Sequence, residues 1–110
     1  PQAKEYLRSK INLQVRLNNY MSLNDLDMLP AKTPLGISIE LCAPTNPGHK
    51  CDLDNQIKAV LDACNGIVYP DDRWIDLIEA HRFLGTGANT LHLSIWEYNE
   101  FFVAACPAYY

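Results

Sequence analysis

Long apolar runs are missing from this 110-residue sequence, and so are paired-cysteine motifs and glycine-rich phosphate loops. No window approaches the roughly 18 consecutive apolar residues that a membrane span requires. Closely spaced charges in residues 1–16 exclude a signal-peptide core. The four cysteines form no C-x-x-C pair, which argues against a zinc knuckle or a thioredoxin-type site and favours buried thiols over two disulfides. The sequence therefore predicts a cytoplasmic protein without a membrane segment.

Basic residues are scarce as well: 9 Lys and Arg stand against 13 Asp and Glu, which gives a formal net charge of −4. Proteins that bind nucleic acids usually carry an excess of Lys and Arg, so this balance argues at first sight against such a partner. Hydrophobic residues make up 48% of the chain and charged residues 20%, a mix typical of a globular domain. The length allows one domain with one core. We therefore expect residues 1–110 to form a single domain, with residues 101–110 as an apolar tail.

Hydrophobic periodicity predicts the order helix, strand, helix, strand, strand. The expected helices cover residues 2–20 and 52–65, and the expected strands cover residues 35–42 and 91–98. Residues 74–83 fit a strand or a helix, and Ile75, Leu77 and the short length favour a strand. Asp52 is the expected N-cap of the second helix, and Gly66 its terminator. Gly85 and Gly87 are expected to form a hairpin-like loop between the last two strands. The pattern predicts a small α/β (α+β) fold, in which a mixed sheet packs against two helices.

Acidic residues gather between positions 52 and 79, where they are opposed by only two basic side chains. Carboxylates this dense repel one another unless a cation neutralises them, and Mg²⁺ prefers carboxylate oxygens. Asp52 and Asp54 open the second helix, Lys58 lies one turn after Asp54, and residues 71–72 add two aspartates in the next turn. Such a group can hold metal ions that activate water beside a phosphate, with the lysine stabilising developing charge. The alternative is that these residues are ordinary caps, turn residues and surface pairs.

Residues 52–75, DLDNQIKAVLDACNGIVYPDDRWI, resemble the signature of the RusA-type Holliday junction resolvases, a family of phage and prophage endodeoxyribonucleases. In that signature D-x-D-N opens a helix, a lysine follows four residues after the second aspartate, and D-D closes the next turn. A basic residue at the end of the following strand is matched by Arg82. Several fixed residues at fixed spacing are far more specific than any one of them. The strand that precedes the first helix in the family is not recognisable here.

The resemblance implies a homodimeric, Mg²⁺-dependent endodeoxyribonuclease, with Mn²⁺ as a possible substitute. Its partner would be branched DNA, a four-way junction, cut during recombination and repair in a bacterial or phage-infected cell. The resemblance implies that Asp52, Asp54 and Asp72 are the metal ligands and that Lys58 is the catalytic lysine. Supporting roles fall to Asn55 and Asp71. The candidate DNA contacts are Lys4, Arg8, Lys10, Arg16, His49, Lys50 and Arg82.

The net charge no longer excludes DNA, because residues 1–16 hold four basic residues and one acid while the acids concentrate elsewhere. Two alternatives stay open. One is a catalytically silent junction-binding module of the same fold, and the other is a structural interaction domain whose acids only face solvent. Binding of Mg²⁺ or Mn²⁺ separates the nuclease from the structural domain.

Overall fold

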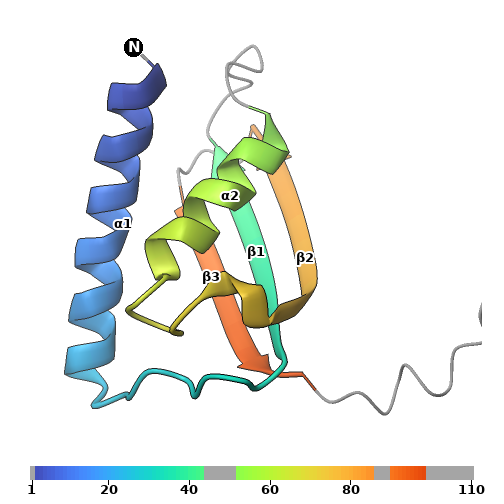
Figure 1. Ribbon diagram of the computed structural model, residues 1–110. Helices are drawn as coiled ribbons and strands as arrows, with labels where there is room; N and C mark the ends of the chain where they lie inside the picture. The colour runs from blue at the N-terminus through green and yellow to red at the C-terminus, as the bar shows by residue number, and fades with distance from the viewer. Residues whose placement is uncertain (1, 44–51, 86–89, 99–110) are drawn as a thin grey trace, which may run out of the picture.

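The computed structural model describes residues 2–43, 52–85 and 90–98. Within these ranges the elements are α1 (Gln2–Leu23), β1 (Leu35–Ala43), α2 (Leu53–Cys64), the short 3₁₀ helix η1 (Asp72–Trp74), β2 (Ile75–Leu84) and β3 (Thr90–Glu97). Figure 1 shows α2 lying across one face of the sheet and α1 standing beside it. The predicted order of elements and the predicted mixed α+β class are confirmed.

The sheet has the order β2-β1-β3, with β1 parallel to β2 and antiparallel to β3. The hairpin expected between the last two strands is therefore wrong, because β2 and β3 lie on opposite sides of β1. The physical reason is the apolar content of β1, whose Leu35, Ile37 and Ile39 are fully buried and occupy the centre of the sheet. The segment β1-α2-β2 is a β-α-β unit, which requires β2 to lie parallel to β1 and leaves the other edge to β3.

The core lies between the sheet and α2. The alternating side chains of β1 meet the apolar face of α2 and the turn that follows it, since Leu, Ile and Val at helical and strand spacing present one face each. From α1, Leu13 and Leu17 pack against this core. The buried cluster consists of Leu35, Ile37, Ile39, Val60, Cys64, Val68 and Tyr69. This packing fixes α2 on the sheet and thereby fixes the positions of both its ends.

The opposite face of the sheet has one tight contact, between Gly36 of β1 and Trp96 of β3. A Cβ at Gly36 would lie 2.6 Å from Trp96 Cε2. The two residues are cross-strand partners, so the indole lies over the glycine. Only glycine gives the ring this space, which places Trp96 against the sheet.

Two further expectations concern cysteines and membranes. Cys42 and Cys64 are free thiols, and Cys64 is buried, as its place on the apolar face of the helix predicts. Cys51, Cys106 and the apolar tail lie outside the described residues. In the part of the chain that the structure describes, no helix is both long and apolar enough to cross a membrane.

Candidate active site

The N-terminal end of α2 carries the first group of predicted site residues. Asp52 occupies the N-cap position with extended backbone angles, but its side chain makes no capping hydrogen bond. The predicted N-cap position of Asp52 is therefore confirmed, and its backbone carbonyl accepts a hydrogen bond from Gln56 N–H at 3.1 Å. Asp54 Oδ1 accepts a hydrogen bond from the backbone N–H of Asn55 at 3.0 Å. Asp54 and Lys58 are exposed and lie one turn apart on the same side of the helix.

Arg82 joins this group from β2. Its Nη1 donates a hydrogen bond to Oε1 of Gln56, in the first turns of α2, at 3.0 Å. In a β-α-β unit the helix runs antiparallel to its strands, so the carboxyl end of β2 meets the N-terminal end of α2. The sequence predicted Arg82 as a DNA contact from its place at a strand end, and the fold brings it beside the predicted catalytic residues. Gln56, which orients it, had no role in the sequence prediction.

The C-terminal end of α2 is anchored in the core. The Tyr69 ring is fully buried, and its hydroxyl donates to the carbonyl of Leu61 at 2.9 Å. The backbone N–H of Gly66 donates to Tyr69 O at 2.7 Å. Gly66 has a φ of 78°, a left-handed conformation that favours glycine, so its predicted role as helix terminator is confirmed. Burial raises the pKa of the Cys64 thiol to about 11 and also raises the pKa of Tyr69.

Asp71 and Asp72 follow this anchored turn. Asp71 caps η1, because its Oδ1 accepts from the backbone N–H of Arg73 at 3.1 Å. Its Oδ2 also lies 3.3 Å from Arg73 Nε. The backbone hydrogen bond from Arg73 lowers the pKa of the Asp71 carboxyl. Partial burial and the neighbouring Asp71 raise the pKa of Asp72, with a smaller contribution from Asp62, while a hydrogen bond from the Asn65 side chain opposes them.

The predicted metal ligands therefore lie at two ends of one helix. Asp72 lies near Asp62 and Asn65, in the last turn of α2 and just after it. Asp54 precedes Asp62 by two turns, which is about 12 Å along the helix axis. Among the described residues, no three His, Cys, Asp or Glu side chains come close enough together to hold a metal ion. The oxygen donors are of the type that Mg²⁺ takes, but one subunit does not bring Asp52 and Asp54 together with Asp72.

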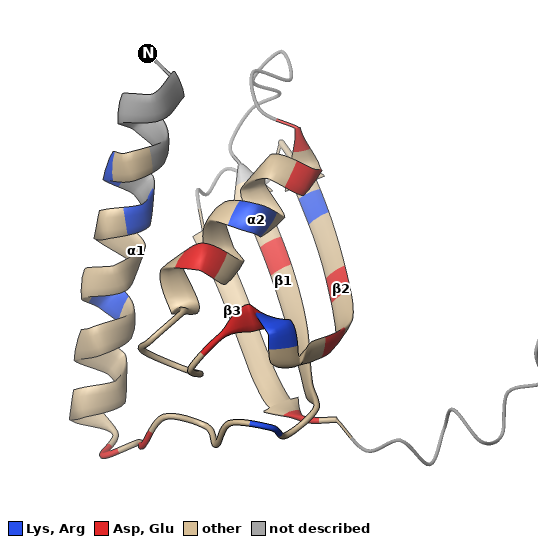
Figure 2. Ribbon diagram, viewed as in Figure 1, with Lys and Arg blue, Asp and Glu red and all other residues tan. Residues whose placement is uncertain are grey.

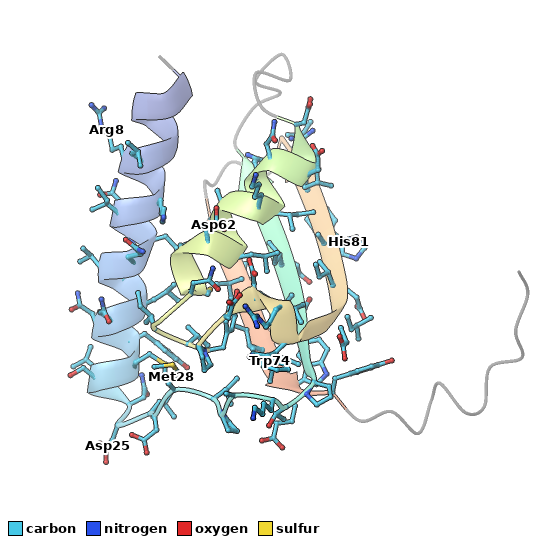
Figure 3. The ribbon with its side chains drawn as sticks, viewed as in Figure 1. Arg8, Asp25, Met28, Asp62, Trp74 and His81 are labelled. Atoms are coloured by element: carbon cyan, nitrogen blue, oxygen red, sulfur yellow. The ribbon has the colours of Figure 1, made fainter. Side chains whose placement is uncertain are left out.

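The remaining candidates lie on α1 or outside the described residues. Arg8 and Arg16 are exposed and Lys10 is half-buried. Figure 2 shows basic residues along α1, which also carries the acid Glu5 near its start, and Figure 3 shows Arg8 pointing away from the rest of the molecule. Lys4 belongs to the same helix. His49 and Lys50 fall in residues 44–51, which the structure does not describe, so these two predictions are not addressed by it.

Two residues at the C-terminal end of α2 were not assigned a role from the sequence. Asp62 raises the pKa of Asp72 and the Asn65 side chain lowers it, so both residues lie near that carboxyl group. Both lie inside the 52–75 stretch. Asp62 and Asn65 lie on either side of Cys64, which is on the buried face at the end of α2. This position could have indicated that both residues lie close to the turn that follows the helix. The contact itself depends on how residues 66–71 fold back, which the spacing does not reveal.

Comparison with protein families identifies the class. The family model described as "Endodeoxyribonuclease RusA" matches residues 3–95, which include α2, η1, β1, β2, all of α1 except its first residue, and most of β3. The class is thus that of the endodeoxyribonucleases, hydrolases that cut DNA within a strand. The chain belongs to the RusA family, as the 52–75 signature predicts. No curated protein matches the sequence.

Proposed function

We propose that this protein is a Mg²⁺-dependent, structure-selective endodeoxyribonuclease that resolves four-way DNA junctions during recombination and repair in the cytoplasm. The observation that carries the proposal is the RusA family match, which spans the D-x-D-N, lysine and D-D elements of the sequence. Family membership supports DNA cutting as the reaction. The metal, the junction preference and the residue roles are the finer part of the proposal.

The residues at the N-terminal end of α2 suit phosphodiester hydrolysis. A bound Mg²⁺ lowers the pKa of a coordinated water and stabilises charge on the phosphate. Asp52 and Asp54 are the oxygen donors for it at this end, with Asn55 beside them. The ammonium of Lys58 lies one turn further on the exposed side, where it stabilises charge that develops on a phosphate oxygen. Arg82, held by Gln56, supports a phosphate of the same strand.

The separation of the ligands supports a homodimer as the active form. Asp54 and Asp62, the helix residue near Asp72, are about 12 Å apart along the helix axis, whereas Mg²⁺–oxygen bonds are about 2.1 Å long. A second copy related by a two-fold axis can present its own Asp72 to the first copy's Asp52 and Asp54, and the reverse holds at the second site. We therefore propose that each metal site combines the N-terminal end of α2 from one copy with Asp71 and Asp72 of the other.

The basic side chains of α1 supply the remaining contacts with DNA in this proposal. Lys4, Arg8, Lys10 and Arg16 lie on one helix, in which Glu5 is the single acid, and His49 and Lys50 follow later in the sequence. With so few cations per chain, junction binding depends on the combined surface of two copies and weakens as salt rises.

The test is cleavage of a synthetic four-way junction against a linear duplex of the same sequence. The wild-type protein is expected to cut the junction preferentially with Mg²⁺ or Mn²⁺. The variant Asp54→Asn is expected to bind the junction but to cut it about 10³-fold more slowly, since a metal ion contributes several kcal/mol to transition-state stabilisation. Asp27→Asn, the same change in an exposed loop, is the matched control and should cut like the wild type.

Two results would contradict the proposal. If the folded protein binds junctions but cuts none with any divalent metal, the silent junction-binding module is the better description. If it neither binds nor cuts DNA, the acids only face solvent and the structural domain is favoured. Equal cutting by Asp54→Asn would remove that residue from the site.

A further inference from the structure

Arg82 reaches α2 from the inner face of β2. Its strand neighbours His81 and Phe83 are exposed and stack on each other, with ring centroids 5.9 Å apart and ring planes at 15°, so they share the outer face of the sheet. Because side chains alternate along a strand, Arg82 lies on the other face, which α2 covers. Its register partner Leu41 packs against the core on that same face. Figure 1 shows this part of β2 beside the first turns of α2.

Gln56 holds the guanidinium of Arg82 by a direct hydrogen bond. Arg82 Nη1 donates to Gln56 Oε1 at 3.0 Å, and both side chains are half-buried. Gln56 is itself fixed in the helix, because its backbone N–H donates to Asp52 O at 3.1 Å and the next residue, Ile57, packs against the core. The acceptor that receives Arg82 is therefore attached firmly to the body of the domain.

Arg82 and Lys58 approach the N-terminal end of α2 from opposite sides. Gln56 and Lys58 are two residues apart, which is about 200° around the helix axis. Gln56 lies on the side that faces β2, as its hydrogen bond with Arg82 shows, and Lys58 lies on the exposed side. A DNA strand that crosses this end of the helix therefore passes one cation on each side of it.

The acceptor for Arg82 is a neutral amide, which determines what the contact can do. A carboxylate in its place would form a stronger, charge-assisted hydrogen bond, but it would also offset the positive charge of the guanidinium. The amide of Gln56 orients the guanidinium without adding a negative charge. A planar guanidinium in a fixed orientation can meet a phosphate with two parallel N–H groups.

We propose that Gln56 is a positioning residue that orients Arg82, without adding negative charge, towards a DNA phosphate on the side of α2 opposite Lys58. The inference rests on the proposed function, in which Arg82 supports a phosphate of the bound strand. Gln56 itself contacts neither the metal nor the reacting phosphate in this role. Because the contact through Arg82 is made in the substrate complex and in the transition state alike, its loss raises KM and changes kcat little.

The first test removes the acceptor. Gln56→Leu keeps the approximate size of the side chain and takes away the oxygen that receives Arg82. Its affinity for a labelled four-way junction, measured without divalent metal, should fall about 10-fold, which is typical for a lost hydrogen bond to a charged group. In junction cleavage KM should rise while kcat stays close to the wild-type value. The matched control is Gln14→Leu, the same change at a half-buried residue of α1, which should bind and cut like the wild type.

A double-mutant cycle with Arg82→Leu shows whether Gln56 acts through Arg82. Arg82→Leu should weaken junction binding by itself, and adding Gln56→Leu should weaken it no further, because the amide then has nothing to orient. If Arg82→Leu weakens binding but Gln56→Leu leaves affinity and KM at wild-type values, the positioning role is wrong and the proposed function stands. An equal loss from Gln56→Leu with and without Arg82 also overturns the role. If the wild type neither binds nor cuts junctions, the proposed function fails and the inference falls with it.

A second variant keeps the inference testable if Gln56→Leu does not fold. Gln56→Glu retains an oxygen acceptor for Arg82 and adds a negative charge beside it. Its control is Gln14→Glu, which adds the same charge on α1. If the contact only ties β2 to α2, the two variants should bind the junction equally, and that result overturns the proposal. We expect Gln56→Glu to bind about 10-fold more weakly than Gln14→Glu, because its carboxylate offsets the charge that Arg82 offers to the phosphate.

Discussion

The two ends of α2 carry similar carboxylates in opposite surroundings. At the N-terminal end, Asp54 and Lys58 face solvent, and the Asp52 side chain does not cap the helix. At the C-terminal end, Asn65 and Asp72 lie against a turn that the fully buried Tyr69 fixes in the core. One helix therefore holds an open group of acids and a tightly constrained group about 12 Å apart. The difference indicates that the two groups contribute different things: accessible charge at one end and a fixed carboxylate at the other.

The largest expected effect comes from mixing subunits. Asp54→Asn and Asp72→Asn alone should each lack cutting activity. A mixed dimer of the two should regain one intact site, because one copy still offers a complete N-terminal end and the other an intact Asp72. Nicking of one junction strand, measured on strand-specific labelled junctions, checks this expectation.

The matched control for this experiment combines two variants of the same end. Asp52→Asn mixed with Asp54→Asn damages both sites of a mixed dimer and should regain nothing. If the mixture of Asp54→Asn with Asp72→Asn is equally inactive although mixed dimers form, the two ends of α2 do not meet across subunits.

The second effect concerns the anchor of the C-terminal end. Tyr69→Ala removes a fully buried ring and should cost about 3–5 kcal/mol of unfolding free energy, a large part of the stability of a domain this size. Tyr69→Phe loses the hydroxyl's hydrogen bonds, to Leu61 O and with the Cys64 thiol, and should cost about 1 kcal/mol. Urea unfolding measures both. In Tyr69→Phe, amide resonances near Asp72 should shift while those near Asp54 stay in place. Equal shifts at both ends would show that the ends are not independent.

The smallest effect is on stability against pH. The folded pKa of Asp72 lies above its ordinary value of 3.8, mainly because of partial burial and Asp71. The folded protein then binds this proton before the unfolded chain does, so this group adds stability as pH falls through its folded pKa towards 3.8. Asp71, with a lowered pKa, acts in the opposite sense and loses its contribution as pH falls below 3.8. In the absence of divalent metal at neutral pH, the free energy of unfolding of Asp72→Asn should exceed that of the wild type by about 0.5 kcal/mol or less, since solvent screens this carboxyl group.

Melting curves of Asp72→Asn and wild type across the acid range check this sign. The advantage of the variant should shrink as pH falls, because the wild-type carboxyl is then neutral as well. A variant that is less stable than the wild type at neutral pH without metal would show that Asp72 is a favourable partner in the fold rather than a strained one.

The sequence predicted the elements well because their signals are local. The alternation of Leu35, Ile37 and Ile39 and the helical spacing of Val60 and Cys64 are set by burial on one face, and both faces are buried as expected. The pairing of the strands was not local. Gly85 suggested a tight turn, but which strand occupies the centre depends on the β-α-β unit as a whole. Helical spacing likewise predicted that Asp54 and Lys58 lie on one side of α2. The position of Asp72 near the C-terminal end of α2 depends instead on the path of residues 66–71, which the spacing does not reveal.

The central position of β1 also has a consequence for the order in which the chain folds. β1 comes before both of its neighbouring strands in the sequence. Those strands, β2 and β3, are formed by residues 75–84 and 90–97. On a ribosome, Leu35, Ile37 and Ile39 therefore have no complete sheet to join until almost the whole described domain has been made. Contacts this distant in sequence slow folding, because a long loop must close before they form. The nascent chain thus carries its most apolar strand without a complete sheet while residues 44–97 are added, which makes that strand the part most in need of a chaperone's protection.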